Sequence, residues 1–134
     1  MNQRPTKPLH PLQDVQELVR AGNFHFERKR CEETVIPIVG DYSKARALIR
    51  DGLLELTEDD FAHREELPDG FTYDVYGLMV SRTLAKATGL KLRRTWYAKL
   101  MIREEEDGRL VFCVSFHRLE KELERNGGLL KPCW

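Results

Sequence analysis

The side chains of this sequence that could transfer protons or hold an anion concentrate in the stretch 93–117. Tyr97, Lys99 and His117 lie there at positions of the same parity, together with the hydroxyl of Ser115. A histidine titrates near neutral pH and can act as a general base or acid, and a lysine supplies positive charge for an anionic oxygen. Acid–base chemistry here would require a backbone that brings these residues together.

Two alternating apolar runs joined by Glu106-Asp107-Gly108 predict that backbone, a β-hairpin. A three-residue loop closed by a left-handed Gly108 pairs Tyr97 with His117, Lys99 with Ser115, Met101 with Cys113 and Arg103 with Val111. A two-residue Asp107-Gly108 turn would mix apolar and polar residues on both faces. The first register makes one face wholly apolar (Ala98, Leu100, Ile102, Leu110, Phe112, Val114 and Phe116) and gathers the polar residues on the other. A solvated sheet face with no chemistry is the alternative interpretation.

The charge distribution favours an anionic partner for this half of the chain. Residues 1–76 hold 10 Lys and Arg against 15 Asp and Glu, whereas residues 77–134 hold 12 against 7. The segment 77–103 carries seven basic residues and no acid. Phosphate contacts need local positive charge rather than a high overall pI, so we expect a polyanion site here. An edge strand kept soluble by Lys and Arg remains the alternative.

Length and composition indicate a single cytoplasmic domain. The 134 residues can bury a core without disulfides or a structural metal. The three cysteines show no paired ligand spacing, so we expect neither a metal nor another cofactor. The longest apolar run is a few residues, which predicts no membrane span or secretory signal. We expect a mobile tail over 1–11, one domain over 12–126 and a C-terminal tail over 127–134.

The order of the elements predicts an α+β fold. Helical spacing marks 12–21 and 43–51, Asn23–Phe26 suggests a brief strand, and 27–40 is ambiguous because of Pro37. Thr57 can cap a further helix, which would place His63 on its exposed side. Phe71–Val80 predicts a strand, 81–92 a loop or short helix, and Leu119–Arg125 a charged helix after the hairpin. We therefore expect N-terminal helices packed on one face of a twisted antiparallel sheet.

Several segments, in order, resemble the MqsR (motility quorum-sensing regulator) family of type II toxins. They are the opening helix Leu12–Gly22, Leu56–Phe61, Asp74-Val75-Tyr76, Tyr97-Ala98-Lys99-Leu100 and Val114-Ser115-Phe116-His117. Together they span about four fifths of the chain. The resemblance implies a RelE-like fold, an mRNA interferase that arrests translation, and a cognate antitoxin protein as partner.

This sequence departs from the family pattern at positions of functional residues. The family's catalytic lysine after Asp-Phe is His63 here, its glutamine before Asp-Val-Tyr is Tyr73, and the lysine ending its last strand is His117, whereas its tyrosine is kept as Tyr97. About ten residues are also inserted between Tyr76 and Tyr97. Two histidines could still supply the base and the acid of metal-independent RNA cleavage.

We therefore predict an endoribonuclease whose catalytic residues are His63, Tyr97, Lys99 and His117. The expected RNA-binding residues are Tyr73, Arg93, Arg94 and Arg103, with Arg93 preferred over Arg94 because it shares the parity of Tyr97. The alternative is a catalytically inactive RelE-like module that binds RNA or a protein partner. A domain with no nucleic-acid role is the third hypothesis, and the sequence leaves open whether the chain forms a homodimer.

Overall fold

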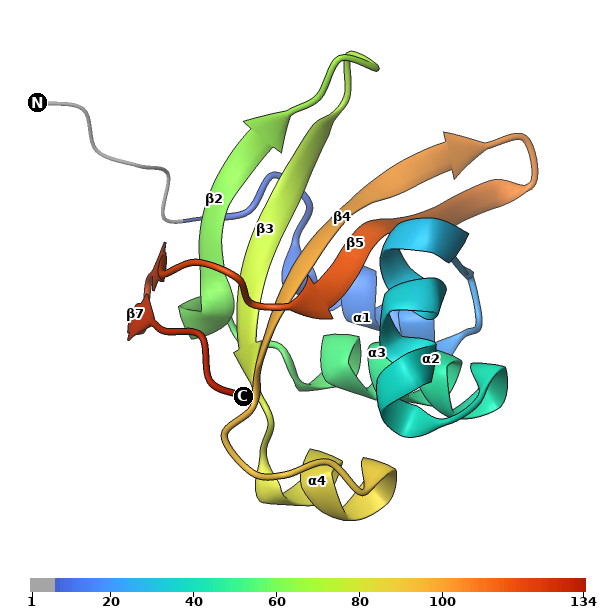
Figure 1. Cartoon of the computed structure of the whole chain (residues 1–134). Coiled ribbons are helices and arrows are strands. Elements are labelled where there is room, and N and C mark those ends of the chain that lie inside the picture. Colours follow the sequence, from blue (N-terminus) through green and yellow to red (C-terminus); the bar gives the residue numbers. More distant parts are fainter. Residues whose placement is uncertain (1–6) are drawn as a thin grey trace, which may run out of the picture.

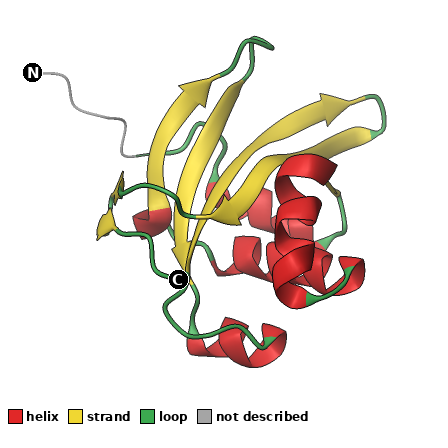
Figure 2. Ribbon diagram, in the orientation of Figure 1, coloured by secondary structure: helices red, strands yellow, loops and turns green. Residues whose placement is uncertain are grey.

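The structure is a computed structural model that describes residues 7–134. Over these residues the chain forms four α-helices, a mixed five-stranded sheet and a two-stranded sheet (Figures 1 and 2). The expected α+β class is confirmed. In chain order the elements are α1 (Leu12–Arg20), β1 (Phe24–Phe26), the π-helical turn η1 (Arg28–Glu32), α2 (Glu33–Val39), α3 (Tyr42–Glu55), the 3₁₀ turn η2 (Glu58–Asp60), β2 (Phe61–Glu66), β3 (Thr72–Met79), α4 (Arg82–Thr88), β4 (Thr95–Glu105), β5 (Gly108–Arg118), β6 (Leu123–Arg125) and β7 (Gly128–Leu130).

The larger sheet has the strand order β1-β5-β4-β3-β2. Strands β2 to β5 are antiparallel neighbours, but β1 lies parallel to β5, with Phe24 opposite Val111 and Phe26 opposite Cys113. The expectation of a wholly antiparallel sheet is therefore wrong. The long helical connection between β1 and the rest of the sheet permits a parallel pairing, which a tight hairpin turn would not.

The β4–β5 hairpin has the predicted register near its open end only. Tyr97 pairs with His117 and Lys99 with Ser115, as predicted, but a bulge at Val114 shifts the register so that Leu100 pairs with Cys113. The predicted pairs Met101–Cys113 and Arg103–Val111 are wrong, because Met101 faces Phe112 and Arg103 faces Leu110. The predicted three-residue loop is also wrong, because Glu105 pairs with Gly108 and only Glu106 and Asp107 lie between them.

The bulge decides which side of β5 enters the main core. Val111 and Cys113 are fully buried there, whereas Leu110, Phe112 and Val114, predicted for the core face, are only partly buried. Phe112 is stacked on His25 at a ring distance of 5.5 Å and covered by the Arg103 guanidinium at 4.2 Å. These neighbours shield it outside the core. A β-bulge, which adds one residue to one strand, changes which face of the sheet the side chains beyond it point toward.

Helices α1 and α3 cover one face of the sheet, and α2 packs against α3 and β5. Their buried side chains, which include Val15, Val19, Leu48 and Leu53, pack with strand residues such as Phe116 in one continuous core. Figure 1 shows α1 and α3 behind the sheet, so the opposite face points toward the viewer. Within residues 7–134 no helix is long and apolar enough to cross a membrane.

The C-terminal segment folds back onto that opposite face. The predicted helix over Leu119–Arg125 is wrong, because β6 and β7 form a small hairpin whose Leu123 and Leu130 pack with Val75 in a second, smaller apolar cluster. A side chain on Gly77 would meet both leucines at under 3 Å. The segment 127–134 is therefore packed rather than a free tail.

The described part of the N-terminal segment is also attached to the sheet. The Leu9 and His10 backbone N–H groups donate to the two carboxylate oxygens of Asp74 at 2.8 Å each, and Arg64 donates to the Lys7 carbonyl oxygen. The tail expected over 1–11 is thus hydrogen-bonded to the sheet at these residues, and residues 1–6 lie outside the described part of the chain. Asp74 is thus a structural residue that anchors the segment leading into α1.

Candidate functional site

The stacked pair of Tyr97 and His117 is the centre of the candidate site. Antiparallel pairing on β4 and β5 places the two residues directly opposite each other on the face that the helices leave open. Their rings lie 4.9 Å apart at an interplanar angle of 15°. The predicted proximity of these two residues is confirmed, and it follows from the hairpin register near its open end.

Lys99 reaches from β4 across β3 to the edge strand β2. Its Nζ atom lies 3.0 Å from Glu65 Oε2, and it also lies 5.7 Å from the centre of the Tyr97 ring. The Lys99 side chain is only 11% exposed, whereas that of Glu65 is 38% exposed. Lys99 is therefore held beside Tyr97 with its charge paired to a carboxylate that reaches solvent.

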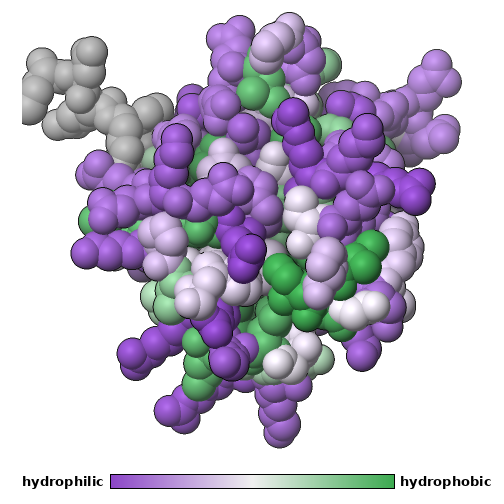
Figure 3. Space-filling view, viewed as in Figure 1, coloured by the Kyte–Doolittle hydropathy of each residue, from purple (hydrophilic) through white to green (hydrophobic). Residues whose placement is uncertain are grey.

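Around these residues the open face is hollowed into a pocket of about 460 Å³, which we call the basic pocket. Figure 3 shows that hydrophilic side chains cover most of this face of the molecule. Segments far apart in the sequence supply its walls: the turn η1, strands β4 and β5, and the loop that follows β5. The lining residues are Arg30, Tyr97, Lys99, Ser115, His117, Leu119, Glu120 and Lys121.

The backbone fixes which nitrogen of His117 can act as a base. The Nδ1 atom lies 2.8 Å from the carbonyl oxygen of Arg118. Because a carbonyl oxygen only accepts, Nδ1 must carry the hydrogen, and Nε2 then has the lone pair that can accept a proton. His117 is half-buried, so this nitrogen belongs to a group that solvent and substrate can reach.

The phenol of Tyr97 keeps its proton over a wide pH range. Burial raises the pKa of Tyr97 well above that of a free tyrosine, and the nearby Glu65 carboxylate raises it further. At neutral pH the group is therefore a neutral hydrogen-bond donor. It can orient an anionic oxygen or give up its proton to one.

His63 lies on the same face of the sheet but is not part of the basic pocket. The predicted helix that would have carried it is a single turn, η2, and His63 lies on β2 opposite Val75, which in turn pairs with Lys99. Three strand spacings separate β2 from β5, so the backbones of His63 and His117 lie at least about 14 Å apart. His63 does not line the basic pocket that contains His117.

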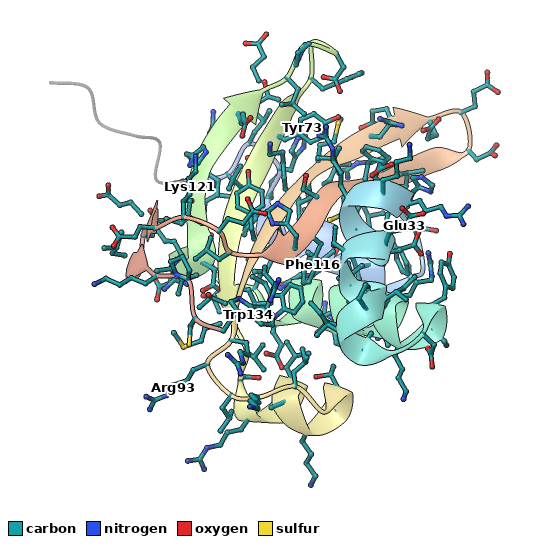
Figure 4. All side chains as sticks on the ribbon, viewed as in Figure 1. Glu33, Tyr73, Arg93, Phe116, Lys121 and Trp134 are labelled. Atoms are coloured by element: carbon teal, nitrogen blue, oxygen red, sulfur yellow. The ribbon has the colours of Figure 1, made fainter. Side chains whose placement is uncertain are left out.

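The expected RNA-binding residues are dispersed over the molecule. Arg93 precedes β4, has a left-handed φ of 66°, and points away from the sheet beside α4 (Figure 4), so the parity that favoured it does not apply. Arg94 lies over the ring of Trp134 at 5.4 Å. Arg103 covers Phe112 at the far end of the hairpin. None of the three lines the basic pocket.

Tyr73 is a structural residue rather than an exposed RNA contact. It is 1% exposed, and its hydroxyl donates to Asp69 Oδ2 at 2.7 Å across the β2–β3 turn. Burial and this carboxylate raise the pKa of Tyr73 to about 12. The same hydrogen bond lowers the pKa of Asp69. Tyr73 therefore holds the turn in place.

Sequence reasoning missed Arg30, Lys121 and Glu65. Arg30 belongs to η1, and a π-helical turn inserted in a helix often marks a functional site. The run Arg28-Lys29-Arg30 is the one sequence signal that could have indicated it. Lys121 was assigned to a helix that does not form, and the pairing of Glu65 with Lys99 depends on strand order, which no local pattern encodes.

Comparisons of the chain with protein-family models, with curated proteins and with solved structures found no match. The resemblance to the MqsR family therefore stays a prediction based on the quoted motifs. Over residues 7–134, no group of three or more His, Cys, Asp and Glu side chains is arranged to hold a metal ion. Fold and site together define an α+β protein with a basic, histidine-containing pocket on the open face of its sheet.

Proposed function

We propose that this protein is an endoribonuclease that cleaves mRNA without a metal ion, the toxin of a type II toxin–antitoxin pair. The observation that carries the proposal is the stacked Tyr97–His117 pair, which puts a proton acceptor and a neutral proton donor side by side next to Lys99. RNA supplies its own nucleophile, the ribose 2′-hydroxyl, so a base, an acid and positive charge are sufficient.

His117 and Tyr97 divide the two proton transfers between them. Nε2 of His117 takes the proton of the 2′-hydroxyl while O2′ bonds to phosphorus. The bond from phosphorus to O5′ then breaks, and O5′ takes the phenolic proton of Tyr97. Solvent exchange returns both groups to their starting states, and the products carry a 2′,3′-cyclic phosphate and a 5′-hydroxyl. His117 is the one histidine that takes part, which agrees with the position of His63 outside the lining of the basic pocket.

The cations of the basic pocket would neutralise the charge that develops on the phosphate. Lys99 lies beside Tyr97, and Arg30 and Lys121 line the basic pocket from separate segments. Each charge-assisted hydrogen bond to the phosphate would contribute about 1.5–3 kcal/mol. The resemblance to the MqsR family supports a RelE-like arrangement, an antitoxin partner and translation arrest in the cytoplasm as parts of the same proposal.

Cleavage of a defined single-stranded RNA in EDTA tests the proposal. We expect cyclic-phosphate ends from the wild type and a rate lower by about two or more orders of magnitude for His117→Ala. His25→Ala is the matched control, because His25 stacks on Phe112 outside the basic pocket. His63→Ala should resemble that control. Growth arrest on expression, relieved by His117→Ala, would support the toxin assignment, whereas intact RNA would refute the nuclease.

The second candidate is an RNA-binding or protein-binding module without catalysis. The observation that favours it is the ion pair of Lys99 with Glu65, which neutralises the cation nearest the proposed reaction centre. Tight, salt-sensitive binding of RNA that remains intact would support this module over the nuclease.

A further inference from the structure

Two arginines from different segments lie over the same indole ring. The guanidinium carbons of Arg94 and Arg118 lie 5.4 Å and 5.0 Å from the centre of the Trp134 ring. Arg94 precedes β4, Arg118 ends β5, and Trp134 follows the C-terminal hairpin. Figure 4 shows Trp134 below the sheet, where these segments meet. We call these three residues the arginine–tryptophan cluster.

Hydrogen bonds and packing hold the indole in place although it remains 40% exposed. Its Nε1–H donates to the carbonyl oxygen of Thr95 at 3.1 Å, and the backbone N–H of Cys133 donates to the Thr95 hydroxyl at 2.9 Å. The indole also packs against Trp96 in a T-shaped contact, at a ring distance of 5.0 Å and an angle of 81°. The ring is therefore a fixed support for the two guanidinium groups.

The positive charges of the cluster are not balanced by neighbouring carboxylates. Over the described residues, neither Arg94 nor Arg118 has an Asp or Glu oxygen within 4.0 Å, whereas Arg46, Arg109 and Arg125 each form such a pair. Guanidinium groups without a counter-charge are available to an anion that can accept several hydrogen bonds. Phosphate fits this description, because the planar guanidinium matches its geometry.

We propose that the arginine–tryptophan cluster is a second phosphate subsite for single-stranded RNA. The inference rests on the proposed function and extends it beyond the nucleotide held in the basic pocket. Arg118 follows His117 directly, so an RNA strand leaving the basic pocket around the end of β5 reaches the cluster within a few nucleotides. Arg94 and Arg118 would bind the phosphate, and Trp134 would act as the positioning residue.

RNA binding as a function of length tests the subsite separately from cleavage. The probes are 2′-O-methyl oligoribonucleotides, a dinucleotide and a decanucleotide, which cannot be cut because they lack the 2′-hydroxyl proton. We expect Arg94→Gln and Arg118→Gln each to weaken decanucleotide binding about tenfold and to leave dinucleotide binding unchanged. Each should also reduce the slope of log K against log salt by about 0.7. Arg20→Gln, at the end of α1, is the control of equal charge change.

Two Trp134 variants separate positioning from folding. Trp134→Phe keeps a ring beneath the guanidinium groups and should retain most decanucleotide affinity, whereas Trp134→Ala should bind like the arginine variants. If Arg94→Gln and Arg118→Gln bind the decanucleotide with wild-type affinity and salt slope, and the dinucleotide still binds, the subsite is overturned. The proposed function is then unaffected. Absence of RNA binding at any length would overturn both. Binding of a polyglutamate peptide in preference to RNA would replace RNA with an acidic protein segment as the ligand.

Discussion

The ion pair between Lys99 and Glu65 provides a sharp test of the site, because stability and RNA affinity should change in opposite directions. At 3.0 Å the Coulomb attraction is about 5.5 kcal/mol at an effective dielectric constant of about 20, and about 1.4 kcal/mol in water. Glu65 is 38% exposed, and desolvation of Lys99 offsets part of the gain. A net contribution of about 1 kcal/mol to the free energy of unfolding is therefore expected.

Glu65→Gln should lower the free energy of unfolding by that amount, measured by urea denaturation. The same change should tighten binding of a 2′-O-methyl RNA about tenfold. In this variant Lys99 would not have to give up its ion pair with a carboxylate before it binds the phosphate. Fluorescence anisotropy measures the affinity. A variant that is both less stable and tighter in binding is the expected signature of a cation held for a ligand.

Glu66→Gln is the matched control for this experiment. It removes the same charge one residue along β2, on the opposite face and exposed to solvent. Both variants share the long-range effect of removing a negative charge, so the difference between them isolates the contact with Lys99. If Glu65→Gln binds RNA no more tightly than Glu66→Gln, Lys99 does not contact the phosphate and the proposed site is wrong in this respect.

Three further predictions concern packing and titration. Gly77→Ala should lower the free energy of unfolding in urea by about 1–3 kcal/mol, because the new methyl group would displace the leucines of the C-terminal hairpin. In native protein a disulfide reagent should modify only Cys133, which is exposed, and should reach Cys31 and Cys113 only after unfolding, because both are buried. The contact with Cys113 and burial also raise the pKa of the Cys31 thiol. Burial raises the pKa values of Tyr73, Tyr76 and Tyr97 in the folded chain. Thermal stability should therefore fall above about pH 10, because the unfolded chain then releases phenolic protons that the folded chain retains.

The pairing of Tyr97 with His117 was predictable because it depends on one hairpin. Only one register makes the residues beside Tyr97 and His117 apolar on the core side, and that register is observed there. The bulge at Val114 was not predictable. The run Leu110–Phe116 is apolar at almost every position, so alternation cannot say which of its residues enter the core. The helices and β1 decide this by burying Val111 and Cys113.

The C-terminal hairpin was missed because tertiary packing overrides local propensity. The stretch Leu119–Arg125 is rich in helix-forming residues and predicts a helix. In the structure Leu123 instead lies against Gly77, whose missing side chain lets the segment approach β3 closely, and Arg125 pairs with Asp60 at 2.9 Å. Two of the walls of the basic pocket follow from such long-range contacts, which is why Arg30 and Lys121 were not predicted.

The separation of the two histidines leads to a prediction for the pH dependence of cleavage. A base and an acid that were both histidines would give a bell-shaped profile, because one must be neutral while the other is protonated. With His117 as base and Tyr97 as acid, the rate should rise with pH through one ionisation and then remain level, since the raised pKa of Tyr97 keeps the phenol protonated at pH values where free tyrosine loses its proton.

Single-turnover rates in EDTA across the neutral and mildly alkaline range measure this profile. Tyr97→Phe keeps the stacked ring but removes the proton donor, so it should lower the rate across the whole range without changing the rising limb. His63→Ala should leave both the shape and the height of the profile unchanged. A bell-shaped wild-type profile that loses its falling limb in His63→Ala would mean that the two histidines act together, and the assignment of Tyr97 as the acid would be wrong.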